Sequence, residues 1–306
     1  MFRKLLGVVV LLSSFAAAVP ALAEGLSWQR VGHGRIFNND ALGDNLDRWQ
    51  TGGMAASWVF ARGGDHALPA APGQMVELRF SGRAIAPANI VAPGVDRLYA
   101  GILSLGAHTH YRTRGWDVAL GLDLVATGPQ TGVDDFQSNL HKIPGIPGLG
   151  AATKASQIAD GIHPSLTVEM GREFMLGTSR VRPFIEGKAG AETLLRVGAD
   201  LTFGRIGQGE LLVREEVTGQ RYRTVTNSGR GTAFVLGGDV AVVGESVFFP
   251  AASPVTMEES RTRLRAGFHW QGERNAAFYG LTWLSEEFVG QTEGQLIGSF
   301  RLDFRF

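Results

Sequence analysis

The regular alternation of apolar and polar residues is the feature that most limits how this chain can fold. In the last segment, "GSFRLDFRF", one face carries Phe300, Leu302, Phe304 and Phe306, and the other carries Ser299, Arg301, Asp303 and Arg305. Successive side chains of a β-strand point to opposite faces, so this spacing predicts a strand with two different faces. About twelve segments along the chain show the same pattern.

The distribution of side chains between the two faces indicates where such strands would lie. In "WDVALGLDL" one face carries Trp116, Val118, Leu120, Leu122 and Leu124, and the other carries Asp117, Ala119, Gly121 and Asp123. Large apolar residues outside and small or charged residues inside suit a barrel that faces lipid. Backbone groups in hydrocarbon must all be paired, so such a sheet has to close. A soluble sandwich also gives alternation and is the alternative. We predict an all-β fold, a transmembrane antiparallel β-barrel of about twelve strands over residues 24–306.

The two ends of the chain indicate the compartment. "MFRK" is a short basic region, "LLGVVVLLSSFAAAV" is apolar, and "ALA" is a small-x-small cleavage site. This order predicts a secretory signal peptide over residues 1–23, with a membrane anchor as the alternative. At the other end, Phe306 on an amphipathic segment resembles the assembly signal of bacterial outer-membrane barrels. We therefore expect outer-membrane localisation and the barrel assembly machinery as a partner.

Charge and cysteine content exclude some classes of protein. The chain has 29 basic and 29 acidic residues, and removal of Arg3 and Lys4 with the signal leaves a net charge of about −2. This balance argues against a nucleic-acid partner. Cysteine is absent, so disulfides contribute nothing to stability, although the predicted signal peptide implies export to a compartment where they could form.

Strand direction predicts which loops lie together. If "SWQRVGHGRIF" rises from the periplasm, the loops after the first, third and fifth strands are extracellular. These loops begin near Asn38, Ile85 and Ala126. The polar region from Leu211 to Arg230 is predicted as another long extracellular hairpin.

Two of these loops contain residues that could do chemistry. In "TGPQTGVDDFQSNLH", Gln137 and His141 are four apart and would share one face of a short helix in an extracellular loop. The first loop, "NNDALGDNLDRWQTGG", carries Asn38, Asn39, Asp40, Asp44, Asp47 and Thr51. Carboxylate and amide oxygens are ligands that calcium takes, and histidine can act as a general base. A metal and a base together can activate water against an ester.

Each of these features also has a purely structural interpretation. Asn, Asp and Gly are common turn residues, and a single histidine on a surface helix is often only solvated. Asp134 and Asp135 would lie in the first helical turn, where acidic residues favour the helix dipole. His108 and His110 share a strand face, but the strand direction places them at the periplasmic end, facing the lumen and away from this rim.

Five segments taken together resemble one family. "NNDALGDNLDRWQTGG" is similar to its first-loop pattern of Asn-Asp, Asp-Arg and aromatic-Thr-x-Gly, although Gln50 here separates the aromatic residue from Thr51. "DRLYAGILSL", "TGPQTGVDDFQSNLHKIPG", "SQIADG" and "SEEFVGQTEGQLIGSFRLDFRF" resemble later segments in the same order. The family is the outer-membrane lipid A 3'-O-deacylase (LpxR) family.

The resemblance implies both a fold and an activity. It implies a twelve-stranded barrel and a calcium-dependent esterase that removes the 3'-linked acyloxyacyl group of lipid A, with its active site facing the outer leaflet and the cell exterior. By position it implies a catalytic set of His141 as general base, Gln137 and Thr51 as positioning groups, and Asn39, with Ca²⁺ held near Asn39 and Asp40. Lipid A, within lipopolysaccharide, is the implied partner.

The chain departs from the family pattern at two places. The family's second extracellular loop offers a lysine, whereas "APANIVAPGV" has none and is only flanked by Arg83 and Arg97. The family also has an acidic residue soon after the histidine, where this chain reads "KIPGIPG". A non-catalytic lipid-binding or structural barrel, and an outer-membrane phospholipase, are the alternative functions.

Overall fold

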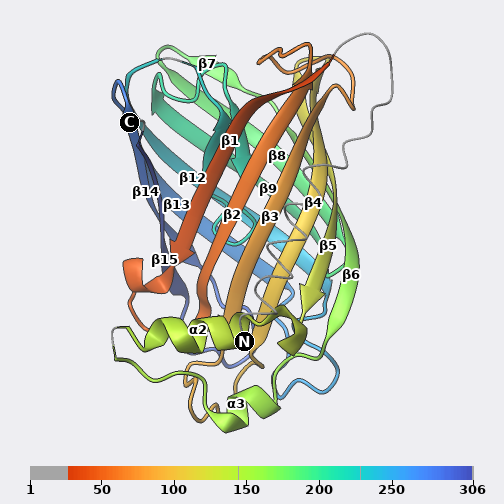
Figure 1. The fold of residues 1–306 in the computed structure, drawn as a ribbon, viewed down its shortest axis with the longest axis vertical. Helices are drawn as coiled ribbons and strands as arrows, with labels where there is room; N and C mark the ends of the chain where they lie inside the picture. The colour runs from red at the N-terminus through yellow and green to blue at the C-terminus, as the bar shows by residue number, and fades with distance from the viewer. Residues whose placement is uncertain (1–26, 144, 228, 305–306) are drawn as a thin grey trace.

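One antiparallel sheet closes on itself in the computed structural model, which describes residues 27–143, 145–227 and 229–304. Neighbouring strands follow chain order, and the circle is completed where the first strand pairs with the last, Phe37 opposite Phe300. The strands that form the wall are β1 (Trp28–Asn39), β2 (Trp49–Arg62), β3 (Met75–Ala86), β4 (Ala100–Thr113), β5 (Trp116–Thr127), β6 (Gly161–Gly171), β8 (Ser179–Ala189), β9 (Glu192–Gly204), β12 (Gly231–Ser246), β13 (Ser260–Gln271), β14 (Asn275–Leu284) and β15 (Gln295–Phe304). In the described chain this is the predicted twelve-stranded barrel, seen from the side in Figure 1.

The short strand β7 (Phe174–Leu176) continues the line of β6. β6 pairs with β8 up to Gly171, opposite Phe184, and β7 then pairs with β8 from Phe174, opposite Val181. The two segments therefore act as one interrupted wall strand. The predicted signal peptide (1–23) and Phe306 lie outside the described residues.

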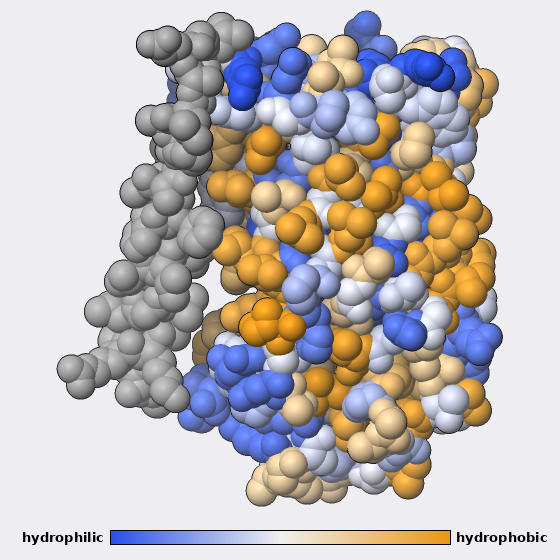
Figure 2. Space-filling model, turned by 90° about the vertical axis from the view of Figure 1, so that its right-hand side faces the viewer, coloured by the Kyte–Doolittle hydropathy of each residue, from blue (hydrophilic) through white to orange (hydrophobic). Residues whose placement is uncertain are grey.

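Large apolar side chains cover the outer face of the wall. On β5 the side chains of Leu122 and Leu124 are 58% and 53% exposed, although both lie in the middle of a strand. Figure 2 shows apolar residues spread over the middle of one side, with hydrophilic residues gathered at the upper end. Exposed apolar residues in the middle of the wall are explained by contact with lipid chains.

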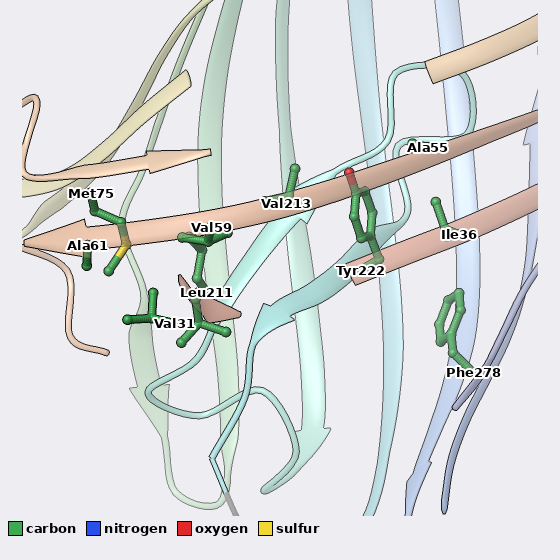
Figure 3. Packing of buried hydrophobic residues seen from close by; sticks show 11 residues of the cluster. Val31, Ile36, Ala55, Val59, Ala61, Met75, Leu211, Val213, Tyr222 and Phe278 are labelled. Carbon is green, nitrogen blue, oxygen red and sulfur yellow. The ribbon is translucent and has the colours of Figure 1, made fainter. Parts of the chain in front are cut away.

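A hairpin fills part of the lumen, and the sequence-based prediction of its position was wrong. Strands β10 (Leu211–Arg214) and β11 (Arg221–Val225) pair with each other. They follow Gly204, at the end of the barrel opposite the predicted site loops. The hairpin folds inward and packs on the inner face of β1, β2 and β3, as the apolar cluster in Figure 3 shows. Its polar sequence suits a charged lumen as well as an exposed loop.

Ion pairs account for much of the remaining interior. The carboxylate of Asp200 accepts hydrogen bonds from Arg214 of the hairpin at 2.9 Å and from Arg265 of β13 at 2.5 Å. Asp239 accepts hydrogen bonds from three arginines of the barrel, Arg196, Arg263 and Arg265. The small and charged residues predicted to point inward are therefore paired across the lumen.

His108 and His110 lie inside the barrel, as predicted. The Nε2 atom of His108 lies 3.0 Å from Asp123, and that of His110 lies 2.7 Å from Glu77. Both side chains are buried and line an interior cavity of about 120 Å³. They belong to the lumen and not to the loops that carry the predicted site.

The helical segments gather at one end of the barrel. The 3₁₀ turn η1 (Asp40–Leu42) follows β1, and η2 (Pro129–Thr131), α2 (Val133–His141) and α3 (Ala151–Ala155) follow β5. Figure 1 shows α2 crossing the lower ends of the strands, with α3 beyond it. The short helix predicted around Gln137 and His141 is confirmed, as is the shared end of the first, third and fifth loops. None of the helices in the described ranges is long and apolar enough to span a membrane.

Gly32 of β1 provides a test of the hairpin's position. A Cβ atom added there would lie 2.2 Å from the carbonyl oxygen of Thr224, which belongs to the hairpin backbone. We expect Gly32→Ala to lower the free energy of unfolding by about 1–3 kcal/mol, because overpacking forces backbone shifts. Urea unfolding of the refolded barrel measures this change.

Gly187→Ala on β8 is the matched control, since an added Cβ there meets nothing within 4 Å. Equal stability of Gly32→Ala and Gly187→Ala would contradict packing of the hairpin against β1.

Candidate active site between the outer wall and α2

A row of small residues on the outer face of the wall lets α2 approach closely. Gly52, Ala84 and Gly101 lie opposite one another on β2, β3 and β4. A Cβ atom at Gly101 would lie 2.6 Å from Thr131 Oγ1 and 2.9 Å from Val133 Cβ. The next residue along β4, Ile102, faces the lumen and lines the interior cavity. Alternation therefore places the row, and the helix on it, outside the barrel.

Local sequence explains where α2 begins and which face it buries. Gly132 precedes the helix in the left-handed conformation, which glycine adopts without strain. Asp134 and Asp135 lie in the first turn, as predicted, where they interact favourably with the helix dipole. The buried polar residues of the helix are Asp134, Gln137 and His141, on the side that faces the wall and the neighbouring loops.

Hydrogen bonds connect α2 to two other loops. The Tyr99 hydroxyl donates to Gln137 Oε1 at 3.0 Å, and Gln137 Nε2 donates to Thr51 Oγ1 at 3.2 Å. Thr51 in turn donates to Asp47 Oδ1 at 3.3 Å. In all three hydrogen bonds donation runs in the same direction, from Tyr99 toward Asp47, so the series ends on the Asp47 carboxylate. Burial, followed by the charges of Asp134 and Asp47, raises the pKa of Tyr99, so its hydroxyl stays protonated and remains a donor.

His141 lies at the far end of this series with one ring nitrogen already engaged. Its Nδ1 atom is 2.8 Å from the carbonyl oxygen of Pro147, which can only accept, so Nδ1 carries the proton. The other nitrogen, Nε2, faces Asp47 Oδ2 at 3.6 Å. In the neutral ring Nε2 is therefore the basic nitrogen, and it points toward the carboxylate that Thr51 orients.

The first loop has a strained backbone where it supplies Asp47. Among described residues other than glycine, four have positive φ, and three of them lie in this loop: Asn45, Asp47 and Trp49. Such conformations cost about 1–3 kcal/mol each and cluster at functional sites. Trp49 is held by an edge contact with Phe288 and by the guanidinium of Arg48, 4.0 Å from its ring.

Asp40 and Asn39, the predicted metal-site residues, lie at the start of the same loop. The Asn39 Oδ1 atom accepts from the backbone of Ala41 at 2.8 Å and so caps η1. Asp40 is buried, and its carboxylate accepts from the backbone of Arg48 at 2.8 Å. Burial raises the pKa of Asp40 to about 7. The hydrogen bond from the Arg48 backbone lowers this pKa, and the negative charges of Asp47 and Asp44 raise it further.

The donor chemistry of this loop fits a hard cation. Within the described residues, Asp40 is a buried carboxylate with no cationic side-chain partner, and the carboxylates of Asp44 and Asp47 repel it. Oxygen donors of this kind suit calcium. Across the described residues, however, no three histidine, aspartate or glutamate side chains are already grouped as a metal cage. Further ligands would have to be other oxygens.

The structure adds two residues that sequence reasoning did not place in the site. Asp47 was only one of several acidic residues in the first loop, and Tyr99 was only part of "DRLYAGILSL". Their roles depend on contacts between separate loops. The structure also explains why Gln50 can stand between Trp49 and Thr51, where the family pattern has no residue. The register of β2 against β3 shifts between Gln50 and Gly52. The resulting bulge accommodates the extra residue beside Thr51.

The two arginines that flank the second loop do not reach this site. Arg83 lies 3.6 Å from Glu216, and Arg97 is fully buried against Glu287. Arg83 pairs in register with Ile102, which faces the lumen, so Arg83 also points inward. Neither side chain replaces a lysine on the outer face of the wall.

Comparison with known proteins identifies the family. The model of the family described as "Outer membrane protein LpxR" matches residues 8–306. The chain belongs to the LpxR family. The solved structure of LpxR from Salmonella typhimurium matches with a TM-score of 0.72 at 17% identity, covering 90% of this chain and all of that chain. At this identity the match shows a shared fold.

Other barrels resemble this LpxR-family chain less. The NanC porin matches with a TM-score of 0.39 at 7% identity, covering 90% of this chain and 100% of that chain. The translocator domain of the autotransporter NalP from Neisseria meningitidis matches with a TM-score of 0.40 at 9% identity, covering 99% and 98%. No curated protein matches by sequence. Family membership and fold together establish an outer-membrane barrel of the LpxR kind.

The close approach of α2 to the wall can be tested at Gly101. We expect Gly101→Ala to displace α2, because the new methyl group would overlap Thr131 and Val133. Hydrogen–deuterium exchange of residues 133–141 should then become faster, while the wall strands stay protected. Gly187→Ala serves again as control, and unchanged exchange in Gly101→Ala would show that α2 does not rest on this row.

Proposed function

We propose that this LpxR-family barrel is a lipid A 3'-O-deacylase, which hydrolyses the 3'-linked acyloxyacyl ester in the outer leaflet. One observation supports this most strongly. The linked residues Tyr99, Gln137, Thr51 and Asp47, together with His141, lie between α2 and the outer face of the wall. A site on this side of the barrel can be reached by a lipid without the lipid leaving the membrane.

In this proposal His141 is the general base. Its Nδ1–H is held by the Pro147 carbonyl, which leaves Nε2 to take a proton from water. Asp47 Oδ2, 3.6 Å away, would accept the second hydrogen of that water and orient it. The proton passes from water to Nε2 while the water oxygen attacks the ester carbonyl, and it is then returned to the leaving alkoxide.

Gln137 and Thr51 are proposed as positioning groups. Their hydrogen bonds, with Tyr99 behind them, keep the Asp47 carboxylate turned toward Nε2. Gly52 contributes by its size: a Cβ atom there would lie 2.9 Å from Asn39 Nδ2. The outer face beside Asn39 therefore stays open for a reacting group, and the amide of Asn39 could donate to it.

Calcium is the proposed cofactor, with Asp40 as its principal ligand and Asn39 beside it. Bound calcium would supply stabilisation of negative charge on the ester oxygen. The role of the protein is to hold Asp40 in a buried position close to Asp44 and Asp47, where their mutual repulsion favours uptake of a cation. Lys142, next to His141 in the chain, is exposed, and its ammonium group, which donates to Asn139 at 2.8 Å, is proposed to contact a lipid A phosphate.

The alternative functions predict different products. A phospholipase would release fatty acids from glycerophospholipid, and a structural barrel would release none. The hairpin and the ion pairs that occupy the lumen argue against a porin-like role. Mass spectrometry of lipid A from cells with and without the protein separates these cases, because only a 3'-deacylase removes the acyloxyacyl mass.

His141→Ala should abolish 3'-deacylation of lipid A, with a loss of about 10²–10⁴-fold, the usual contribution of a general base. Gln137→Ala should cost less, because its role is positioning. The assay is lipid A mass spectrometry together with rates on purified protein. His66→Ala is the control, since His66 is exposed in the turn between β2 and β3, at the other end of the barrel. Full activity of His141→Ala would exclude the proposed base.

Asp40→Asn should lose calcium-stimulated activity while the barrel still folds, because Asp40 lies in a loop and not in the wall. Chelation of the wild type should have the same effect and be reversed by added Ca²⁺. Asp65→Asn, in the turn at the opposite end, is the matched control and should behave as wild type. Undiminished hydrolysis after chelation would rule out the calcium role.

A further inference from the structure

Three apolar side chains near the candidate site are exposed on one side of α2. Phe136 is 65% exposed, Leu140 is 48% exposed and Ile143, just after the helix, is 82% exposed. Their spacing of four and then three residues places them in one stripe along the helix, because an α-helix has about 3.6 residues per turn. None of the three takes part in the hydrogen-bonded series of the site.

The opposite side of α2 faces α3. Lys154 of α3 donates to Asp135 at 2.8 Å, and Gln157, just after α3, donates to Asp134 at 3.3 Å. At about 100° per residue, the direction midway between these two acidic residues lies about 170° around the helix from the direction midway between Phe136 and Leu140. Figure 1 shows α3 on the side of α2 that is farther from the strands. The apolar stripe therefore faces away from α3, toward the part of the barrel where the strands lie, and not against the wall, which the buried side with Gln137 and His141 contacts.

The stripe is continuous with the apolar outer face of the barrel. The helix rests on Gly101, and two residues farther along β4, about 7 Å, the outer face carries Leu103. Beyond it Leu105, 39% exposed, lies opposite Leu124, 53% exposed, on β5. The apolar stripe of α2 therefore lies next to the end of the apolar, lipid-facing surface of β4 and β5.

We propose that Phe136, Leu140 and Ile143 are inserted among the acyl chains of the membrane leaflet at the α2 end of the barrel. The helix then works as an interfacial segment, with its apolar stripe in lipid and its acidic side against α3 and water. The occupant of this surface is lipid, because the surface continues the face of the wall that lipid already covers. The inference rests on the barrel's outer-membrane location and is independent of the hydrolytic reaction.

The chain has no cysteine, so single labels can be placed without altering other residues. Phe136→Cys, Leu140→Cys and Ile143→Cys are each labelled with an environment-sensitive fluorophore and reconstituted into phosphatidylcholine vesicles. Leu124→Cys on the wall is the lipid-exposed reference, and Ala152→Cys, exposed on α3, is the matched control. Quenching is measured with acyl-brominated phosphatidylcholine and with aqueous iodide.

The proposal predicts that labels at all three stripe positions are quenched by the brominated lipid about as strongly as the label at Leu124. The label at Ala152 should respond mainly to iodide. Ile143 makes the least contact within the protein, so its variant tests the proposal even where another variant fails to fold. The result holds equally in a His141→Ala background, which separates it from failure of the proposed hydrolase.

Two outcomes would overturn the proposal. Bromolipid quenching at the stripe no greater than at Ala152 would place the stripe in water. Oxidation of the unlabelled Ile143→Cys protein to a disulfide-linked dimer in vesicles, with no lipid quenching, would show that a second copy of the chain covers this surface.

Discussion

Backbone amides and carbonyls cannot remain unpaired in hydrocarbon, because no water is present to satisfy them. Every wall strand of this chain therefore needs two neighbours, and the pairing of β1 with β15 removes the last free edges. Once the sheet is closed, each strand has one face toward lipid and one toward the lumen. The exposed leucines of β5 and the ion pairs around Asp200 and Asp239 are the two results of that single constraint.

Closure also decides where the loops can go. Twelve strands leave a lumen wide enough to admit the β10–β11 hairpin. Its apolar residues pack against β1 to β3, and its Arg214 pairs with the wall carboxylates Glu169 and Asp200. At the other end, the small residues Ala84 and Gly101 on β3 and β4 let α2 lie close to the outside of the wall. The candidate site and the lipid-facing surface of the barrel thus lie on the same side of the sheet.

The hydrogen-bonded series connects separate loops because their strand ends meet at this rim. Thr51 follows the first loop, Tyr99 precedes β4 and Gln137 belongs to the loop after β5, yet Gln137 forms hydrogen bonds with both of the others. The strained backbone around Asp47 is maintained by these contacts and by the packing of Trp49. The surrounding contacts hold this strained backbone so that Asp47 faces His141. Strained conformations of this kind cluster at sites of reaction or ligand binding.

Local periodicity in the sequence was sufficient to predict the strands, their lipid-facing side, the short helix and the shared face of Gln137 and His141. These features depend on residues two to four positions apart, whose relation is set by backbone geometry alone. Other features depend on which strands meet and in what register. The inward turn of the hairpin, the bulge at Thr51, the inward direction of Arg83, and the positions of Asp47 and Tyr99 became known only from the closed barrel. A polar side chain has many possible partners along the sequence, and closure of the sheet determines which of them it reaches.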